Sequence, residues 1–171
     1  MSFSFSLPSI VALPSASLAE EVPPGQCPEE WYCRHPEVLS AFYRKIQALG
    51  PALLLAPTAG ANAACLAEFG LEDTVRELNL RLMQQAKEAA APLGLPVGGM
   101  LGPTGLFVPP LGEADFDDVY ELYRQQVHEL VKAGADFLYL SGHHCLSDLR
   151  AAMLAAKRKK LPVLASLTVD S

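Results

Sequence analysis

Histidine and cysteine side chains gather in two segments of this 171-residue chain. One is the tetrapeptide Gly142-His143-His144-Cys145, and the other is the long segment Pro14–Pro36. The possible metal ligands in the two segments are His143, His144, Cys145, Cys27, Cys33 and His35. Imidazole and thiolate are the ligands that zinc prefers, and three or four of them suffice. The sequence therefore offers a candidate metal or thiol site. The spacing matches no standard ligand motif, so the alternative, that these residues never meet, stays open.

An alternation of strands and helices must position these residues. Five short apolar runs predict strands, at Ser9–Leu13, Ala52–Ala56, Val97–Leu101, Phe137–Ser141 and Pro162–Thr168. Helical periodicity predicts four main helices and one short one, at Glu37–Leu49, Glu72–Leu93, Phe116–Ala133, Ser147–Lys160 and Ala61–Phe69. Ser147 is the expected N-cap of the last helix. This order is typical of an α/β protein with a parallel sheet, either a small open sheet or part of an eight-stranded barrel.

In a parallel βα architecture, functional groups lie in the loops that follow the strands. The expected loops are Pro14–Pro36, Pro57–Asn62, Gly102–Gly112 and Gly142–Leu146. Thr58 and Asn62 can donate hydrogen bonds to a ligand from the second of these loops. Asn62 can equally cap the short helix that follows it, and both interpretations remain open.

Composition excludes several classes of function. The net charge of −6 and the pI near 5.2 argue against nucleic acid as a partner. No apolar stretch is long enough to span a membrane. Half of the residues are hydrophobic and 19% are charged, which is typical of an ordered globular chain. We expect a cytoplasmic protein in which Cys27, Cys33, Cys65 and Cys145 are free thiols.

Four short motifs follow one another along the chain: Thr58-Ala59-Gly60-Ala61-Asn62, Gly102-Pro103-Thr104-Gly105, Gly134-Ala135-Asp136 and Ser166-Leu167-Thr168. Together, from about Pro36 to Ser171, they resemble the homocysteine-binding domain of the homocysteine S-methyltransferases, a family that includes cobalamin-dependent methionine synthase and betaine–homocysteine methyltransferase. The resemblance implies a partial (β/α)8 barrel, formed by residues 1–171 as a single domain that lacks the last three strands. It also implies methyl transfer to a homocysteine thiol, a step of methionine biosynthesis, in which zinc held by three cysteines activates the thiol.

The chain departs from this family pattern at the residues that would bind substrate and metal. The family's zinc cysteines follow strands six and eight, so no cofactor is expected in this chain, although zinc is implied for the complete domain. The acidic residue of strand one falls at about Ala12-Leu13, and the family's Asn before Thr58 falls at Pro57. The Glu that would hold the substrate's amino group falls at Ser141. The candidate substrate-binding residues are therefore Thr58, Asn62 and Ser141.

Three functions remain open at this point. The chain is a methyltransferase-type domain that is inactive alone, a non-catalytic half-barrel that docks onto a partner chain or onto itself, or a small metal- or thiol-binding protein. Because the strand at Val163–Leu167 is apolar and carries no protecting charge or proline, we expect a homo-oligomer or a complementary chain to cover it.

Overall fold

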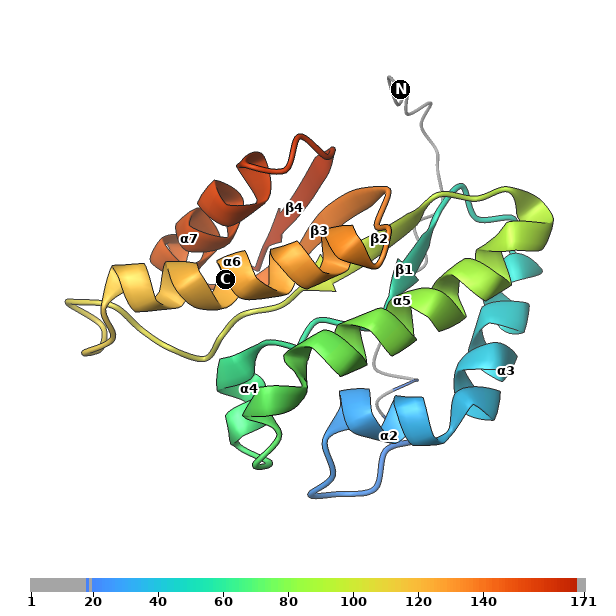
Figure 1. Ribbon diagram of the computed structural model, residues 1–171, viewed down its shortest axis with the longest axis horizontal. Coiled ribbons are helices and arrows are strands. Elements are labelled where there is room, and N and C mark those ends of the chain that lie inside the picture. Colours follow the sequence, from blue (N-terminus) through green and yellow to red (C-terminus); the bar gives the residue numbers. More distant parts are fainter. Residues whose placement is uncertain (1–17, 19, 169–171) are drawn as a thin grey trace.

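A computed structural model of the protein describes residue 18 and residues 20–168, so the expected strand Ser9–Leu13 lies outside the described residues. The other four expected strands are present and form one sheet in the order β1-β2-β3-β4 (Figure 1). Every neighbouring pair is parallel, as predicted. The strands are β1 (Leu54–Ala56), β2 (Val97–Leu101), β3 (Phe137–His143) and β4 (Val163–Leu167).

Helices separate the strands along the chain. The α-helices are α2 (Pro28–Arg34), α3 (Pro36–Gln47), α4 (Ala63–Ala67), α5 (Val75–Ala90), α6 (Phe116–Lys132) and α7 (Leu146–Lys157). Short 3-10 turns, η1 (Glu72–Thr74) and η2 (Ala91–Leu93), extend α5 at its two ends, so the expected helix Glu72–Leu93 is found almost unchanged. No helix in the described part of the chain has the length and apolar character needed to cross a membrane.

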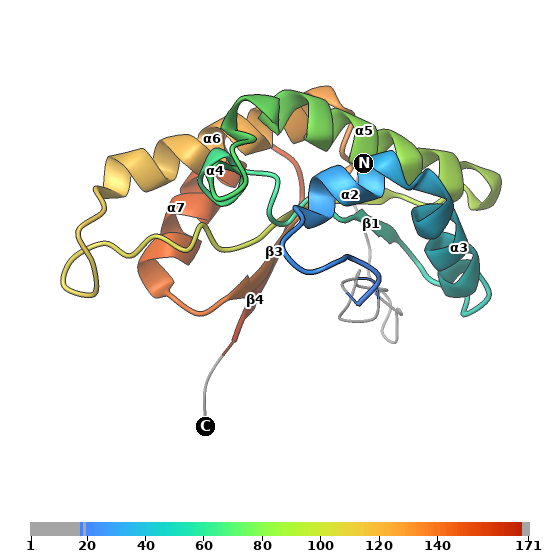
Figure 2. The same ribbon diagram turned by 90° about the horizontal axis from the view of Figure 1, so that it is seen from below.

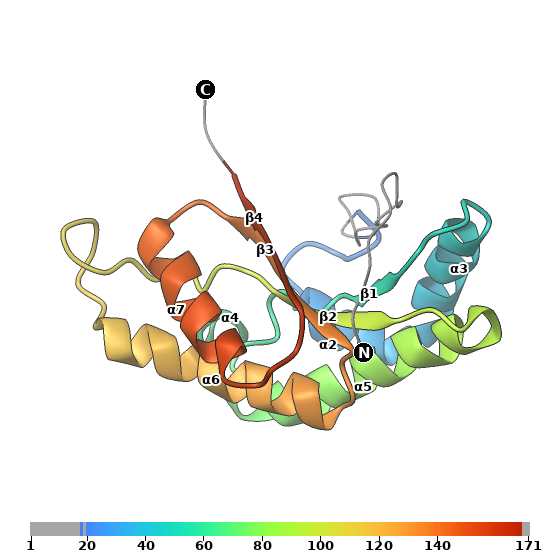
Figure 3. The same ribbon diagram turned by 90° about the horizontal axis from the view of Figure 1, so that it is seen from above.

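Strands β1 and β2 are buried on both faces, and β3 is largely buried, whereas β4 is partly exposed. Successive residues of a strand point to opposite faces, so the two faces contribute to different clusters. On the face toward the helices, Leu54, Leu101 and Leu138 belong to the main hydrophobic cluster, which also includes Leu82 of α5. On the opposite face, Leu55, Met100 and Phe137 belong to a smaller cluster. Figures 2 and 3 show α5, α6 and α7 together on one side of the sheet, the arrangement of a barrel's outer layer.

Helix α2 was not expected, since the whole segment Pro14–Pro36 was interpreted as loop. Its sequence nevertheless carries helix signals: Pro28 opens it, acidic residues occupy its first turn and Arg34 lies in its last turn. Tyr32 of this helix is buried in the main cluster. The loop prediction is therefore wrong for residues 28–34, where tertiary packing stabilises a helix too short to form alone.

Two predicted boundaries near β3 also need correction. The strand continues to His143, two residues beyond the expected end, through a register irregularity between Leu140 and His143. Gly142 there has a φ of +68°, a conformation that glycine adopts without strain. The N-cap of α7 is Cys145, not Ser147, and its side chain makes no cap hydrogen bond. The longer strand places Ser147 inside the first turn of the helix.

Leu82 and Leu80 of α5 offer a matched test of this packing. Leu82 is fully buried in the main cluster, whereas Leu80 is 47% exposed. We expect Leu82→Ala to lower the free energy of unfolding by about 2–5 kcal/mol, because a cavity remains in the core. Leu80→Ala should change it by about 0.5 kcal/mol or less. Urea denaturation of both variants measures the difference, and equal effects would contradict the placement of α5.

Candidate functional site

The loops after β1, β2 and β3 lie at the same edge of the sheet, because parallel strands end there together. The loop after β1, residues 57–62, contains the expected Thr58-Ala59-Gly60-Ala61-Asn62 motif. Its neighbour is the loop after β2: the Gly102 N–H donates to the Ala59 carbonyl oxygen over 3.0 Å. The expected grouping of these loops at one edge is thus found.

Thr58 fastens the first of these loops to the sheet. Its fully buried hydroxyl donates to the Met100 carbonyl oxygen over 2.8 Å and accepts from the Met100 N–H over 2.9 Å. Its own carbonyl oxygen accepts from the Gln126 amide of α6 over 2.6 Å. The polar groups of Thr58 that were expected to face a ligand are engaged within the protein here.

The rest of the loop is held in the same way. Asn62 is the N-cap of α4: its side-chain oxygen accepts from the Cys65 N–H over 3.0 Å, as one of the two interpretations held. The Ala61 carbonyl oxygen accepts from the Asn79 amide of α5 over 2.7 Å. The Gly60 N–H donates to the carboxylate of Glu29 in α2 over 2.8 Å. Side chains from α2, α5 and α6 therefore converge on one short loop.

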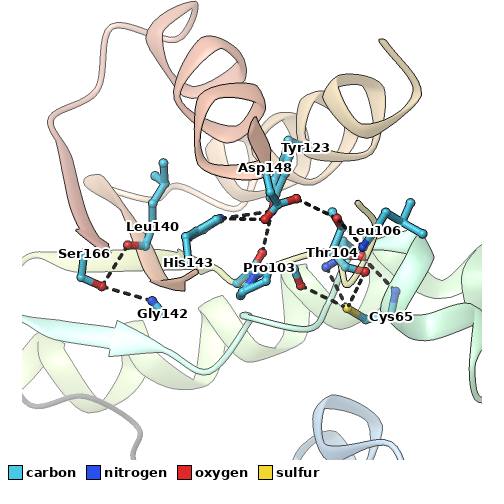
Figure 4. Close-up of polar contacts among 12 residues, drawn as sticks. Cys65, Pro103, Thr104, Leu106, Tyr123, Leu140, Gly142, His143, Asp148 and Ser166 are labelled. Carbon is cyan, nitrogen blue, oxygen red and sulfur yellow. Dashed lines mark hydrogen bonds and ion pairs between the residues drawn. The ribbon is translucent and has the colours of Figure 1, made fainter. Parts of the chain in front are cut away.

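A second polar cluster lies between the sheet and helices α6 and α7 (Figure 4). Asp148 in the first turn of α7 accepts from the Thr104 hydroxyl and from the Tyr123 hydroxyl, each over 2.7 Å. His143, at the end of β3, places Nε2 3.1 Å from the Tyr123 oxygen and 3.5 Å from Asp148. All four side chains are buried. They tie the loop after β2, the end of β3 and two helices into one unit.

The contacts of Tyr123 favour one tautomer of His143. The Tyr123 hydroxyl donates to Asp148 over 2.7 Å and also lies 3.0 Å from the Gly102 carbonyl oxygen, which leaves its own oxygen as an acceptor for Nε2–H of His143. Nδ1 of His143 is then a buried acceptor without a partner in the described structure. Burial lowers the pKa of His143, against the opposing effect of Asp148, so the ring is neutral. Burial, with Asp148 adding to it, raises the pKa of Tyr123.

The candidate metal ligands do not converge. Among residues 18 and 20–168, no group of three or more His, Cys, Asp and Glu side chains is placed to hold a metal ion. His143 lies in the buried cluster, exposed His144 has its ring 5.9 Å from that of Phe107, and Cys145 is buried. On the first segment, His35 packs its ring 4.4 Å from that of Trp31. The structure places these loops at one edge without bringing their ligands together.

The thiols themselves are poor ligands in these surroundings. Burial raises the pKa of Cys27 to about 11 and that of Cys33 to about 12, and it also raises the pKa of Cys65. Thiolate is the form that binds metal, so these groups are protonated at neutral pH. Cys65 is half-buried, and its sulfur lies 3.3 Å from the Asn62 amide nitrogen and 3.5 Å from the Pro103 carbonyl oxygen.

The resemblance places polar or acidic substrate-binding residues at positions that carry no acidic side chain in this chain. Ser141 is half-buried in β3, and Pro57 is buried directly after β1. Ala12 and Leu13 lie outside the described residues. The sequence interpretation gave no site role to Glu29, Tyr123 and Asp148, which are buried near these loops. Tyr123 shares the apolar face of α6 with Val119 and Val127, so its spacing marks it as buried but not as a hydrogen-bond partner. For Glu29 and Asp148, no local spacing distinguishes the residue from a solvated helix residue.

Thr58 allows a direct test of the loop's attachment. Thr58→Val keeps the shape but leaves the Met100 N–H and C=O without their partner. We expect the free energy of unfolding to fall by about 1–3 kcal/mol. Thr58→Ser keeps the hydroxyl, so its free energy of unfolding should fall by less than half as much. Chemical denaturation compares the two variants, and an equal loss in both would show that the hydroxyl contributes no more to stability than the methyl group does.

His143 makes stability depend on pH. Because its folded pKa lies below the usual 6.5, the unfolded chain takes up a proton first as the pH falls. The free energy of unfolding should therefore decrease below about pH 6.5, by at most about 1.4 kcal/mol per pH unit from this group. His143→Gln keeps a donor near Tyr123 and should flatten this part of the curve. Denaturation of both proteins at several pH values measures this difference. If the free energy of unfolding of the wild type and of His143→Gln depended on pH with the same slope, a neutral buried ring would be contradicted.

Comparison with known proteins agrees with this geometry. The family model for homocysteine S-methyltransferase matches residues 11–171. The chain is 27% identical over 147 residues to methionine synthase from Mycobacterium tuberculosis (strain ATCC 25618 / H37Rv) and 28% identical over 147 residues to that of Mycobacterium leprae (strain TN). Each match covers 80% of this chain but 12% of the relative. The chain therefore spans about an eighth of the length of these curated relatives.

Solved structures show the same fold. The metallated homocysteine methyltransferase MmuM from Escherichia coli superposes with a TM-score of 0.75 at 20% sequence identity, over 90% of this chain and 59% of that one. The apo form of the same enzyme gives a TM-score of 0.69. These barrels match the parallel strands and their helices in order. With a family model that matches nearly its whole length, the chain belongs to the homocysteine S-methyltransferase family.

Proposed function

We propose that this chain forms the first part of a homocysteine S-methyltransferase barrel and provides one wall of its amino-acid site. The observation that carries the proposal is the edge at which β1, β2 and β3 end. There the loops at residues 57–62 and 102–105 are fastened to each other and to three helices. A rigid wall of this kind can orient a bound amino acid without rearranging.

The described residues do not fit the zinc ion that the family implies. Their thiols are dispersed, those of Cys27 and Cys33 are protonated at neutral pH, and no set of three ligands is in place among the described residues. The proposal therefore assigns binding and orientation to this chain and leaves activation of the homocysteine thiol to other polypeptide. A free thiol with a pKa near 8.5 is only about 3% thiolate at pH 7.

The edge of β4 supports a second part of this proposal, that further polypeptide closes the barrel there. β4 is the last strand of the sheet, and in the described structure its outer edge has no neighbouring strand. Leu167 at its end is 43% exposed, and Val163 and Leu164 are partly exposed. An apolar edge of this kind pairs readily with another strand. The covering segment is either continuous with this chain or a separate partner, including a second copy.

Methyl transfer provides the functional test. The 171-residue chain alone should transfer methyl groups to homocysteine at least about 30-fold more slowly than a complete barrel, from the loss of thiolate alone. A chimera that appends, after Thr168, the part of the E. coli enzyme not covered by this chain should bind zinc and regain activity. The assay uses S-methylmethionine, methylcobalamin or betaine as donor. Full activity of the chain alone would contradict the proposal.

Ligand binding tests the amino-acid wall independently of catalysis. In NMR spectra of the 171-residue chain, L-homocysteine should cause saturable shifts in the amides of residues 57–62 and 102–105. Glycine, which lacks the thiol side chain, is the matched control and should cause none. Absence of shifts at millimolar homocysteine, or shifts confined to another face, would overturn the proposed site.

A further inference from the structure

The carboxylate of Glu29 is buried against the loop after β1. The side chain is 8% exposed, although it belongs to a seven-residue helix at the molecular edge. Oε1 accepts from the Gly60 N–H over 2.8 Å, and the weak S–H of Cys27 lies 3.6 Å from Oε2. A carboxylate has about four acceptor positions, and of these two contacts the one from the Gly60 N–H is the stronger.

Gly60 is shaped to receive this carboxylate. A Cβ atom at position 60 would lie 2.7 Å from Oε1 of Glu29, closer than real Cβ contacts allow. Any side chain there would force the carboxyl group to shift from its present position. Glycine and glutamate are therefore complementary: the contact exists because residue 60 has no side chain and residue 29 has a long acidic one.

Glu29 differs in kind from the other groups that hold the loop. Thr58, Asn79 and Gln126 act through neutral hydroxyl and amide groups, whereas Glu29 can carry a charge. The titratable groups that face it in the described structure are thiols and a phenol, on or beside α2 and on α4: Cys27, Cys33, Tyr32 and Cys65. Their pKa values are raised, so they are neutral near pH 7 and none of them compensates the charge.

The charge of Glu29 works against folding. Burial raises the pKa of this carboxyl above its usual 4.5, against the hydrogen bonds from its own N–H, from Gly60 and from Cys27. The folded state therefore binds the proton more tightly than the unfolded chain does, and stability falls as the pH rises and Glu29 ionises. A neutral amide of the same shape would avoid this cost. Groups kept at such a cost commonly serve a site.

We propose that Glu29 is a positioning residue of the homocysteine site: its carboxyl group accepts from the Gly60 amide and holds the loop 57–62 in the shape that faces the ligand. The loop is then clamped from two sides, by Glu29 at Gly60 and by Gly102 at Ala59. A hydrogen bond to an ionised acceptor is roughly twice as strong as a neutral one, which is why the charge matters. This inference rests on the proposed function above.

The grip itself is tested by an NMR pH titration of the 171-residue chain. The Gly60 amide should show one inflection, above pH 4.5, that reports the ionisation of Glu29. Glu29→Gln should remove it. The Met100 amide, bonded to the neutral Thr58 hydroxyl, is an internal control that should lack this inflection. An unchanged inflection in Glu29→Gln, or none in the wild type, would overturn the inference whatever the ligand.

A double-mutant comparison checks the contact by a second measurement. Gly60→Ala should shift the amides of residues 57–62 strongly in the wild-type background, because the new Cβ collides with Glu29. In the Glu29→Ala background the same substitution should cause much smaller shifts, because the carboxylate is gone. Equal shifts in both backgrounds would show that the effect of Gly60→Ala does not depend on the contact with Glu29.

Homocysteine affinity tests whether the hydrogen bond between Glu29 and Gly60 contributes to ligand binding. At a pH above the Gly60 inflection, where Glu29 is ionised, Glu29→Gln should weaken homocysteine binding roughly fivefold while leaving the midpoint of urea unfolding unchanged or raised. Glu30→Gln is the matched control, since Glu30 lies on the same helix and pairs with exposed Arg34. If the wild type does not bind homocysteine, the proposed function falls and this role falls with it. If the wild type binds and Glu29→Gln binds equally well, only the present inference falls.

Discussion

The two hydrogen bonds between the Thr58 hydroxyl and the backbone of Met100 fix the geometry on which the candidate site depends. They join the loop after β1 to β2 at the point where a regular ladder stops, because β1 is only three residues long. Once Thr58 is fixed, Ala59 meets Gly102, Gly60 meets Glu29 and Ala61 meets Asn79. Each of those contacts requires the loop to leave β1 in one direction. The polar residues of the motif at 58–62 suggest ligand binding, but their hydrogen bonds fix the direction in which the chain leaves β1.

The buried cluster around Asp148 performs a similar task one loop further along. In this family the end of the corresponding strand is expected to carry an acidic substrate-binding residue, and here Ser141 occupies that place. Two residues later, His143 turns toward the helices through the irregularity at Gly142 and joins Tyr123 and Asp148. Full burial keeps the imidazole neutral, so the cluster is a structural connection and not an exposed acid–base pair. The polar residues at this edge serve the scaffold at least as much as any ligand.

The elements were largely predictable from the sequence because strands and helices here obey simple periodicity. Val97–Leu101 reads as a buried strand and is one, and Phe116–Lys132 departs from its expected bounds by one residue. The candidate site was harder to predict. Whether Asn62 caps a helix or faces a ligand, and whether His143 meets a cysteine or a tyrosine, depends on long-range packing. Glu29 lay in a proline-rich segment interpreted as loop, and nothing in its neighbourhood marks it as buried. Local pattern predicts elements well, whereas the partners of a buried polar group are set by tertiary contacts.

The distribution of charge and of potential metal ligands indicates which chemical roles this part of the barrel can serve. Burial keeps the thiols of Cys27, Cys33 and Cys65 protonated, and the acidic groups at the loop edge, Glu29 and Asp148, accept internal hydrogen bonds. Neither arrangement can lower the pKa of a substrate thiol, which requires a nearby cation or metal. What this part of the barrel supplies is a fixed surface, and the free edge of β4 is where a segment with the missing chemistry would add. In the barrel that we propose, positioning and activation would be separate: the loops at β1 to β3 would orient the amino acid, and the strands beyond β4 would provide the charge that makes its sulfur a nucleophile.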